Sequence, residues 1–276
     1  MKIMSYTVAL MVTLVLAHVA SAEIGHFEGF EDSGWAANQT DNWQNFYSEI
    51  ERADSLTDGI TSRTGNAHAI ITNLGTAENV FGEQTLGAGG VYTRFGGYSS
   101  SFGSGFTARL DVYLDINWSE GEGLDYSVGI NDSGGSHMRD YIMHIGVTDQ
   151  GLLVNSSCNS DLSFNEYKLE NENDKAYGTI TQTGWYTMEH KFYDDAGTVS
   201  VDTSLLDSTG DSVWSATIGS SDEVATAGGH RYGWFTFCNI DGLALDNTTV
   251  VPEPTSLMLL LGAAVSGLVL TRRRRR

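Results

Sequence analysis

Carboxylates are the side chains of this sequence that could most simply carry out catalysis. Glycoside hydrolysis needs two of them about 5 to 9.5 Å apart. Asp111 and Asp115 lie on one face of an expected strand, but Cβ atoms four residues apart in a strand are separated by about 13 Å. The sequence also has no His-Glu-x-x-His, Gly-x-Ser-x-Gly, Walker or Cys-x-x-Cys motif. We therefore expect a protein that is not an enzyme.

Aromatic side chains in a glycine-rich segment could instead bind sugar. The segment Gly-Gly-Val-Tyr-Thr-Arg-Phe-Gly-Gly-Tyr contains Tyr92, Arg94 and Tyr98. Aromatic faces beside hydrogen-bonding side chains suit a sugar ring, so these three residues are predicted to bind a ligand. Trp43 and Trp118 are further candidates, although the tryptophans could equally fill a core.

These side chains must be positioned by β-strands. Residues 106–116 alternate without a break between apolar and polar side chains, which predicts a strand with one buried face. Shorter runs with turn residues between them are expected as strands at 126–130, 141–147, 185–193, 199–205, 214–218, 232–237 and 243–250. No stretch between residues 23 and 250 predicts an amphipathic helix. One all-β sandwich or jelly roll, concanavalin-like in size and strand number, is the expected fold.

Composition restricts the partners of this domain. Residues 23–251 contain 9 basic and 34 acidic residues, which gives a net charge of −25. Binding to phosphate requires clustered Lys and Arg, so nucleic acid is excluded as a partner. A hydrophobic content of 41% is sufficient for a packed core.

The N-terminal segment has the pattern of a secretory signal peptide. Lys2 precedes the apolar run 6–17, and Ala20-Ser21-Ala22 offers small residues for cleavage. Residues 1–22 are therefore expected to be a signal helix that engages the Sec export machinery. A membrane anchor is the alternative, but the run is shorter than the roughly 18 to 20 residues that span a bilayer.

The C-terminal segment combines three features in a fixed order. Pro252, Glu253 and Pro254 are the only Pro-Glu-Pro sequence, and an uncharged stretch expected to form a hydrophobic helix follows at 256–270. The cluster that should stop transfer across the membrane comprises Arg272, Arg273, Arg274, Arg275 and Arg276. Residues 251–276 resemble the PEP-CTERM sorting signal of Gram-negative bacteria. An ordinary stop-transfer anchor is the alternative.

The resemblance implies a route for the protein. An exosortase would recognise Pro252, Glu253 and Pro254 and remove the tail after transient anchoring in the inner membrane. The protein would then reach the outer surface or the extracellular matrix. The chain thus divides into a signal peptide at 1–22, a sandwich domain at 23–250 and a sorting signal at 251–276.

Two short segments resemble the first and last strands of carbohydrate-binding-module sandwiches. They are Gly29-Phe30-Glu31-Asp32 and Leu243-Ala244-Leu245-Asp246-Asn247. The resemblance implies that Glu31 and Asp246 share a structural calcium ion, since hard oxygen ligands suit calcium. Two exposed acids at a sheet edge are the alternative, and no other cofactor is expected.

The only two thiols, Cys158 and Cys238, are 80 residues apart. Export would permit a disulfide. Cys238 ends an expected strand and Cys158 lies in the expected polar loop 155–161, so the sequence leaves their pairing open.

The sequence favours an exported, non-enzymatic protein with a structural or adhesive role in the exopolysaccharide matrix. A carbohydrate-binding module is the main alternative, with extracellular polysaccharide as its partner. A polysaccharide hydrolase or lyase is the remaining one.

Overall fold

A computed structural model describes residues 25–39, 43–72, 74, 76–78, 84–86, 90–158 and 177–253. The expected signal peptide, Pro254, the hydrophobic stretch 256–270 and the terminal arginines lie outside these residues. Within the described ranges, no helix has the length and apolar character needed to cross a membrane. The single helical element there is the 3-10 turn Thr57–Gly59.

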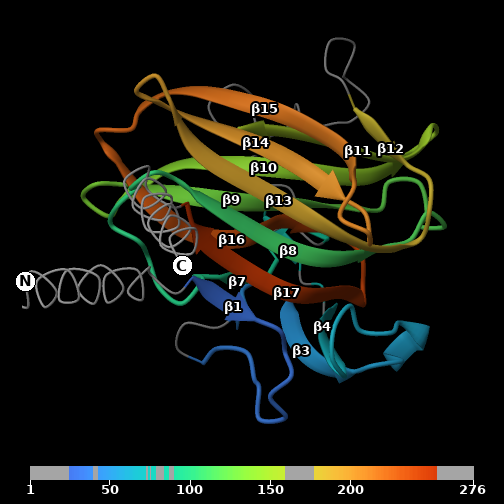
Figure 1. The fold of residues 1–276 in the computed structure, drawn as a ribbon. Helices are drawn as coiled ribbons and strands as arrows, with labels where there is room; N and C mark the ends of the chain where they lie inside the picture. The colour runs from blue at the N-terminus through green and yellow to red at the C-terminus, as the bar shows by residue number, and fades with distance from the viewer. Residues whose placement is uncertain are drawn as a thin grey trace, which may run out of the picture.

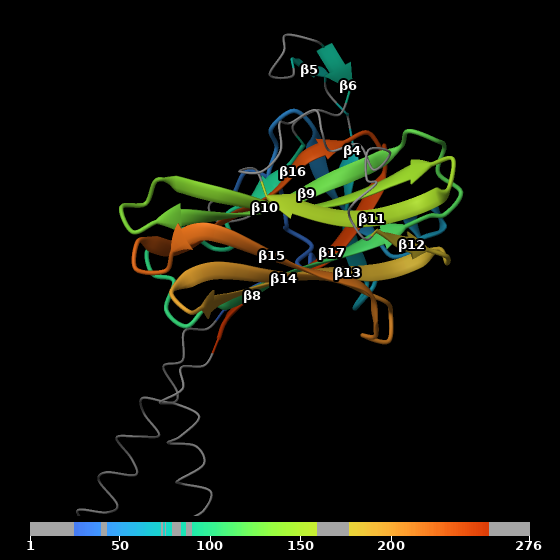
Figure 2. The ribbon, with the colours of Figure 1, turned by 90° about the horizontal axis from the view of Figure 1, so that it is seen from above.

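Two antiparallel sheets lie face to face, as Figures 1 and 2 show. The first sheet has the order β15 (Ser212–Glu223), β14 (Thr198–Leu206), β13 (Gly184–Asp195), β8 (Phe106–Leu114), β17 (Leu243–Pro252), β4 (Ala67–Thr72) and β3 (Glu49–Asp54). The second sheet has the order β12 (Gly178–Ile180), β11 (Gly151–Cys158), β10 (His137–Thr148), β9 (Gly123–Asp132), β16 (Ala227–Cys238), β7 (Tyr92–Thr93) and β2 (Trp43–Gln44). The expected all-β sandwich is confirmed.

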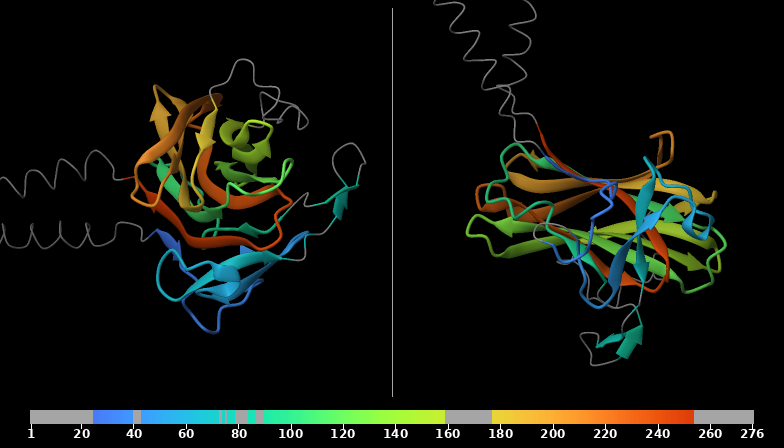
Figure 3. Two further views of the ribbon diagram at one scale, coloured as in Figure 1. Left: turned by 90° about the vertical axis from the view of Figure 1, so that its right-hand side faces the viewer. Right: turned by 90° about the horizontal axis from the view of Figure 1, so that it is seen from below.

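Short strands complete the architecture. β1 (His26–Glu28) pairs with β17, so the first and last strands lie side by side (Figure 3). A separate hairpin is formed by β5 (Thr76–Glu78) and β6 (Gln84–Leu86).

The alternating segment 106–116 forms the central strand β8. Its apolar positions from Phe106 to Leu114 face the core, while Arg109 is exposed. β8 ends at Leu114, and Ile116 lies beyond the strand with 41% of its surface exposed. All eight expected strands are present, as β8, β9, β10 and β13 to β17.

The prediction of a polar loop at 155–161 is wrong for residues 155–158, which form the end of β11. Leu152 and Val154 join the core on one side of this strand, while Asn155 and Ser157 lie on the opposite side. Residues 155–157 resemble a loop in sequence because the apolar residues of the strand precede them, so the strand shows no regular alternation of apolar and polar side chains.

The core between the sheets is rich in aromatic rings. Trp43 stacks on Phe235 at 6.1 Å, and Phe106 stacks on Phe192 at 4.3 Å. Every member of the core cluster lies between Phe30 and Val250. The core of the described residues thus lies within 23–253, the part of the chain that is suited to study as a separate folding unit.

Cys158 and Cys238 form no disulfide with each other. Both are on the second sheet, but β10 and β9 lie between their strands, which separates them by about 14 Å at ~4.8 Å per strand. Cα atoms joined by a disulfide are only about 4.4 to 6.8 Å apart. Burial raises the pKa of the Cys238 thiol to about 12, so this side chain is an inert core thiol.

Candidate functional site

A hollow lined by aromatic rings lies over the outer face of the second sheet. Its volume is about 240 Å³, and we call it the aromatic hollow. It is lined by Phe46, Tyr92, Tyr98, Tyr232 and Trp234. Three of these rings come from strands β7 and β16, and the other two from the segments that follow β2 and β7.

The two-residue period of β16 places Tyr232 and Trp234 on the outer face. Gly233 between them points inward, where a Cβ atom would collide with the hydroxyl of Tyr126. Trp234 lies opposite Tyr92 in the register of β16 and β7, so these two rings are neighbours. The sheet thus sets the floor of the aromatic hollow.

Hydrogen bonds and close packing hold the rings in place. The Trp234 indole N–H donates to the Gly90 carbonyl at 3.2 Å, and the Tyr232 hydroxyl donates to Asp140 at 2.9 Å. A Cβ atom on Gly129 would lie 2.7 Å from the Tyr232 ring, so glycine lets this ring lie close to the sheet. The rings of the floor are therefore held in fixed positions.

The rim of the aromatic hollow carries two guanidinium groups. The Arg94 Cζ atom lies 5.9 Å from the Tyr92 ring centre and 5.3 Å from that of Tyr98. The Arg231 Cζ atom lies 4.7 Å from the Tyr98 ring centre and 5.8 Å from that of Tyr232. Aromatic faces for stacking are thus combined with charged hydrogen-bond donors.

The structure brings together the predicted residues Tyr92, Arg94 and Tyr98, and their role in binding stays a prediction. Trp43 was a wrong candidate for sugar contact, because its ring is fully buried. Trp118 packs against the core. The residues that the sequence reasoning missed are Phe46, Arg231, Tyr232 and Trp234. Alternation within 232–237 could have indicated that Tyr232 and Trp234 share a face.

The aromatic rings remain accessible to a ligand. Tyr98 is 45% exposed and Phe46 is 55% exposed, although large apolar rings are usually more buried. Phe46 meets the Tyr92 and Trp234 rings edge to face, each at 6.2 Å. The arrangement can stack a ring-shaped ligand while the guanidinium groups bind its polar substituents.

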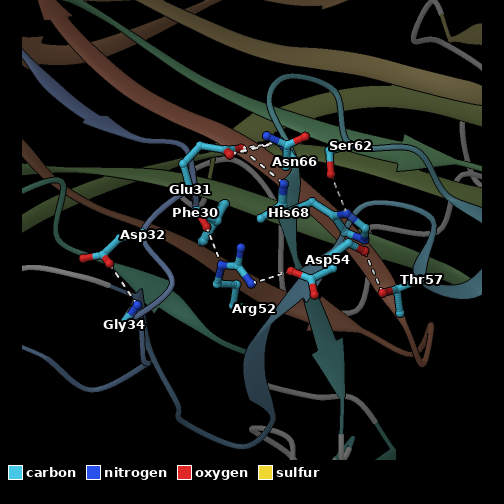
Figure 4. Close-up of polar contacts among 11 residues, drawn as sticks. Phe30, Glu31, Asp32, Gly34, Arg52, Asp54, Thr57, Ser62, Asn66 and His68 are labelled. Carbon is cyan, nitrogen blue, oxygen red and sulfur yellow. Dashed lines mark hydrogen bonds and ion pairs between the residues drawn. The ribbon is translucent and has the colours of Figure 1, made fainter.

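Glu31 is held by the turn that precedes β4 (Figure 4). Its carboxylate accepts hydrogen bonds from the backbone N–H groups of Asn66, at 3.0 and 3.1 Å, and of Ala67 at 3.3 Å. Gly65 has a φ of +60°, and a Cβ atom there would collide with the Glu31 carboxylate. The turn therefore needs glycine at this position.

Asp246 meets the same turn from the last strand. It is fully buried and accepts the N–H groups of Thr64 at 3.1 Å and Asn247 at 2.8 Å. Burial raises the pKa of Asp246 to about 6, and the negative charges of Asp111 and Glu31 add to this rise. Asp111 lies directly opposite Asp246 in the register of β8 and β17. The sequence reasoning did not include Asp111 in this group.

Calcium is the cofactor predicted for Glu31 and Asp246. Each of their four carboxylate oxygens accepts a backbone N–H, and calcium prefers six to eight oxygen ligands. Among the residues that the structure describes, no group of three or more His, Cys, Asp or Glu side chains could hold a metal ion. The described side chains alone do not complete a calcium site, and calcium here stays a prediction.

A Ser-His-Asp chain of hydrogen bonds crosses β9, β10 and β11. The Nδ1 atom of His144 lies 2.7 Å from Asp125 Oδ1, and its Nε2 atom lies 2.8 Å from Ser157 Oγ. An Asp on Nδ1 favours the tautomer whose Nε2 accepts the serine proton. Ser157 is only 6% exposed. No local motif indicates this group, because its members lie on three separate strands.

The sandwich holds the beginning of the Pro-Glu-Pro sequence. β17 runs through Pro252, beyond the domain boundary expected at residue 250. The Glu253 carboxylate accepts a hydrogen bond from Thr107 at 2.8 Å, and the Glu253 N–H donates to the Gly105 carbonyl at 2.9 Å. The Ser104 hydroxyl donates to the Glu253 carbonyl at 2.6 Å. The motif therefore starts directly at the edge of the folded domain.

Two solved structures are similar to parts of this chain at low identity. One is described as the conserved carbohydrate esterase vb_24B_21 from Shiga toxin-encoding bacteriophage phi24B, with 9% identity, a TM-score of 0.44, and coverage of 77% of this chain and 91% of that one. The other is the CBM2 module of the evolved Dit of Lactobacillus casei BL23 phage J-1, with 9% identity, a TM-score of 0.35, and coverage of 84% and 99%. A comparison with curated proteins finds no match.

The C-terminal segment matches a family model described as the PEP-CTERM protein-sorting motif, over residues 250–276. This match agrees with the order of Pro-Glu-Pro, apolar stretch and arginine cluster in the sequence. The motif implies export, transient membrane anchoring and processing by an exosortase. Residues 250–276 of this chain are a PEP-CTERM protein-sorting motif.

Proposed function

We propose that this exported protein binds extracellular polysaccharide through the aromatic hollow, and that this binding gives it an adhesive or structural role in the matrix outside the cell. The observation that carries the proposal is the group of five aromatic rings around one hollow on the outer sheet face. The proposed location outside the cell follows from the sorting motif at 250–276.

The size and chemistry of the aromatic hollow favour a sugar over a larger apolar ligand. Pockets for drug-sized molecules measure about 300 to 1,000 Å³, whereas this hollow has about 240 Å³ and room for about one sugar ring. Sugar rings present C–H faces to aromatic rings and hydroxyl groups to polar side chains, and both partners are available here.

A glycan array tests the proposal. The exported protein, or residues 23–253, is expected to retain polysaccharide fragments both with calcium and with a chelator, because the aromatic hollow contains no acidic lining residue. Retention of no glycan under either condition would contradict the proposal. Retention that requires calcium would place the binding site elsewhere.

Replacement of the motif prolines tests the sorting route. The double variant Pro252→Ala with Pro254→Ala is expected to leave a longer, membrane-bound product in the native host, because the exosortase would no longer recognise its motif. Immunoblots of membrane and medium fractions measure this. Ser256→Ala, just outside the Pro-Glu-Pro sequence, is the control. A product of normal length in the medium would refute recognition of these prolines.

Hydrolysis of an acyl ester is a second candidate function, favoured by the Ser157, His144 and Asp125 arrangement. Ser157 Oγ would attack the ester carbonyl while His144 Nε2 takes the hydroxyl proton and then gives it to the leaving alcohol. Water would then attack the acyl-serine while His144 takes a proton from the water. His144 returns this proton to Ser157 Oγ as the carboxylate leaves, which restores the free serine. The burial of Ser157 counts against this function.

A fluorophosphonate probe distinguishes a nucleophile from a structural hydrogen-bond chain. Labelling of the exported protein that disappears in Ser157→Ala, but persists in Ser127→Ala on the same sheet, would support the ester hydrolase. An unlabelled wild-type protein would leave the chain of hydrogen bonds with a structural role, as its burial favours.

A further inference from the structure

We infer that the aromatic hollow is selective for anionic polysaccharide, with a sugar carboxylate bound by Arg94 and Arg231. This inference rests on the proposed function and names the class of sugar. It is carried by the distribution of arginine partners over the whole sandwich.

The domain contains six arginines between residues 23 and 251, all within the described ranges. Four of them form ion pairs with carboxylates: Arg52 with Asp54 at 2.7 Å, Arg63 with Asp111 at 3.6 Å, Arg109 with Glu189 at 2.6 Å, and Arg139 with Asp222. Among the residues that the structure describes, Arg94 and Arg231 have no carboxylate partner.

Both of these arginines are placed at the aromatic hollow. Their guanidinium groups flank Tyr98, at 5.3 Å for Arg94 and 4.7 Å for Arg231. Tyr98 therefore lies close to two guanidinium groups that form no ion pair with a carboxylate of the described residues. A guanidinium group has a planar set of donors that matches a carboxylate.

Arg231 is held in a fixed position for such a contact. Its Nη1 atom donates to Asn131 Oδ1 at 2.8 Å and to the Gly135 carbonyl at 2.9 Å. Its Nε atom is buried and has no hydrogen-bond partner among the described residues. Arg94, in contrast, is exposed and can adjust to the ligand. One fixed and one adaptable cation would together orient an acidic sugar.

The net charge of −25 makes this local arrangement necessary for an acidic ligand. An anionic polymer is repelled by most of the surface, and screening at physiological salt limits the range of each charge's interactions to about 8 Å. Attraction must therefore come from cations in direct contact with the bound sugar. The same repulsion would prevent non-specific adsorption of the polymer elsewhere on the domain.

The test compares one polymer in two charge states. The exported protein, or residues 23–253, is titrated with polygalacturonate and with its carboxyl-reduced form, and also with the host's own polysaccharide before and after carboxyl reduction. The wild type is expected to bind the acidic forms at least about tenfold more tightly, since hydrogen bonds to charged groups are the stronger ones. Equal affinity for both forms would overturn the inference and leave polysaccharide binding intact. Binding to neither form would instead contradict the proposed function.

Variants identify the source of the preference. Arg94 is exposed and its side chain forms no ion pair with a described carboxylate, so Arg94→Gln should reduce the preference for the acidic form several-fold. The double variant with Arg231→Gln should abolish this preference. Lys191→Gln, an exposed cation on β13 of the other sheet, is the matched control and should change nothing. An unchanged preference in Arg94→Gln would overturn the inference even if the double variant failed to fold.

Discussion

Trp234→Ala is expected to weaken polysaccharide binding by about 30-fold, which corresponds to about 2 kcal/mol. The Trp234 ring lies on the floor of the aromatic hollow, beside Tyr92 and against Phe46. Its removal deletes the largest stacking surface of the site and opens the packing of both neighbours. Affinity electrophoresis or calorimetry with fragments of the host polysaccharide measures the change.

A matched control removes a tryptophan from the other sheet. Trp185 on β13 is also only partly buried and also donates its indole N–H to a backbone carbonyl, that of Thr61 at 2.7 Å. Trp185→Ala should leave affinity unchanged, although both variants are expected to lower the melting temperature. If Trp234→Ala is folded and binds polysaccharide as tightly as the wild type, the aromatic hollow is not the binding site.

Asp246→Asn is expected to remove a change of about 3 kcal/mol in the free energy of unfolding that the wild type shows between acidic and neutral pH. The folded protein binds the Asp246 proton more tightly than the unfolded chain does, because the pKa is about 6 rather than 3.8. This contribution to stability is present in full below pH 3.8 and is lost as the pH rises through 6. Two pH units correspond to about 3 kcal/mol. The wild type should therefore lose this amount, relative to the variant, between about pH 3.5 and pH 7.

Urea unfolding at a series of pH values measures this difference directly. Burial lowers the pKa of His190 to about 3 and that of His230 to about 4, so these two histidines add stability as the pH rises from about 3 to 6.5. These histidines are the same in both proteins, so their effect cancels in the difference. Asp241→Asn, at an exposed turn, is the control. A difference between Asp246→Asn and the wild type that is constant with pH would contradict the account of Asp246.

The sequence predicted those parts of the fold in which periodicity is regular. The alternation of 106–116 indicated one buried face, and its first nine residues form β8 at the centre of the first sheet. The sorting motif was also readable, because its three parts are contiguous in sequence. Strands of two or three residues, such as β2 and β7, could not be predicted from a period. They form by pairing at the edge of the sheet, where β7 pairs with the long strand β16 and β2 pairs with β7.

The part of the candidate site that could be predicted is the part that is contiguous in sequence. Tyr92, Arg94 and Tyr98 belong to one segment, and their proximity follows from short sequence separation. Trp234 reaches them only through the register of β16 and β7, a pairing between residues about 140 positions apart. Whether Cys158 and Cys238 pair could not be decided from the sequence for a related reason. Strand order decides their distance, and composition does not encode that order.

Hydrogen–deuterium exchange with and without polysaccharide tests most directly whether the aromatic hollow is the binding site. Fragments of the host's extracellular polysaccharide are added to the exported protein, and exchange is followed by peptide mass spectrometry. Slower exchange is predicted in peptides that cover residues 90–98 and β16, with β13 to β15 unchanged. Binding accompanied by protection only in β13 to β15, or no binding to any fragment, would contradict the account.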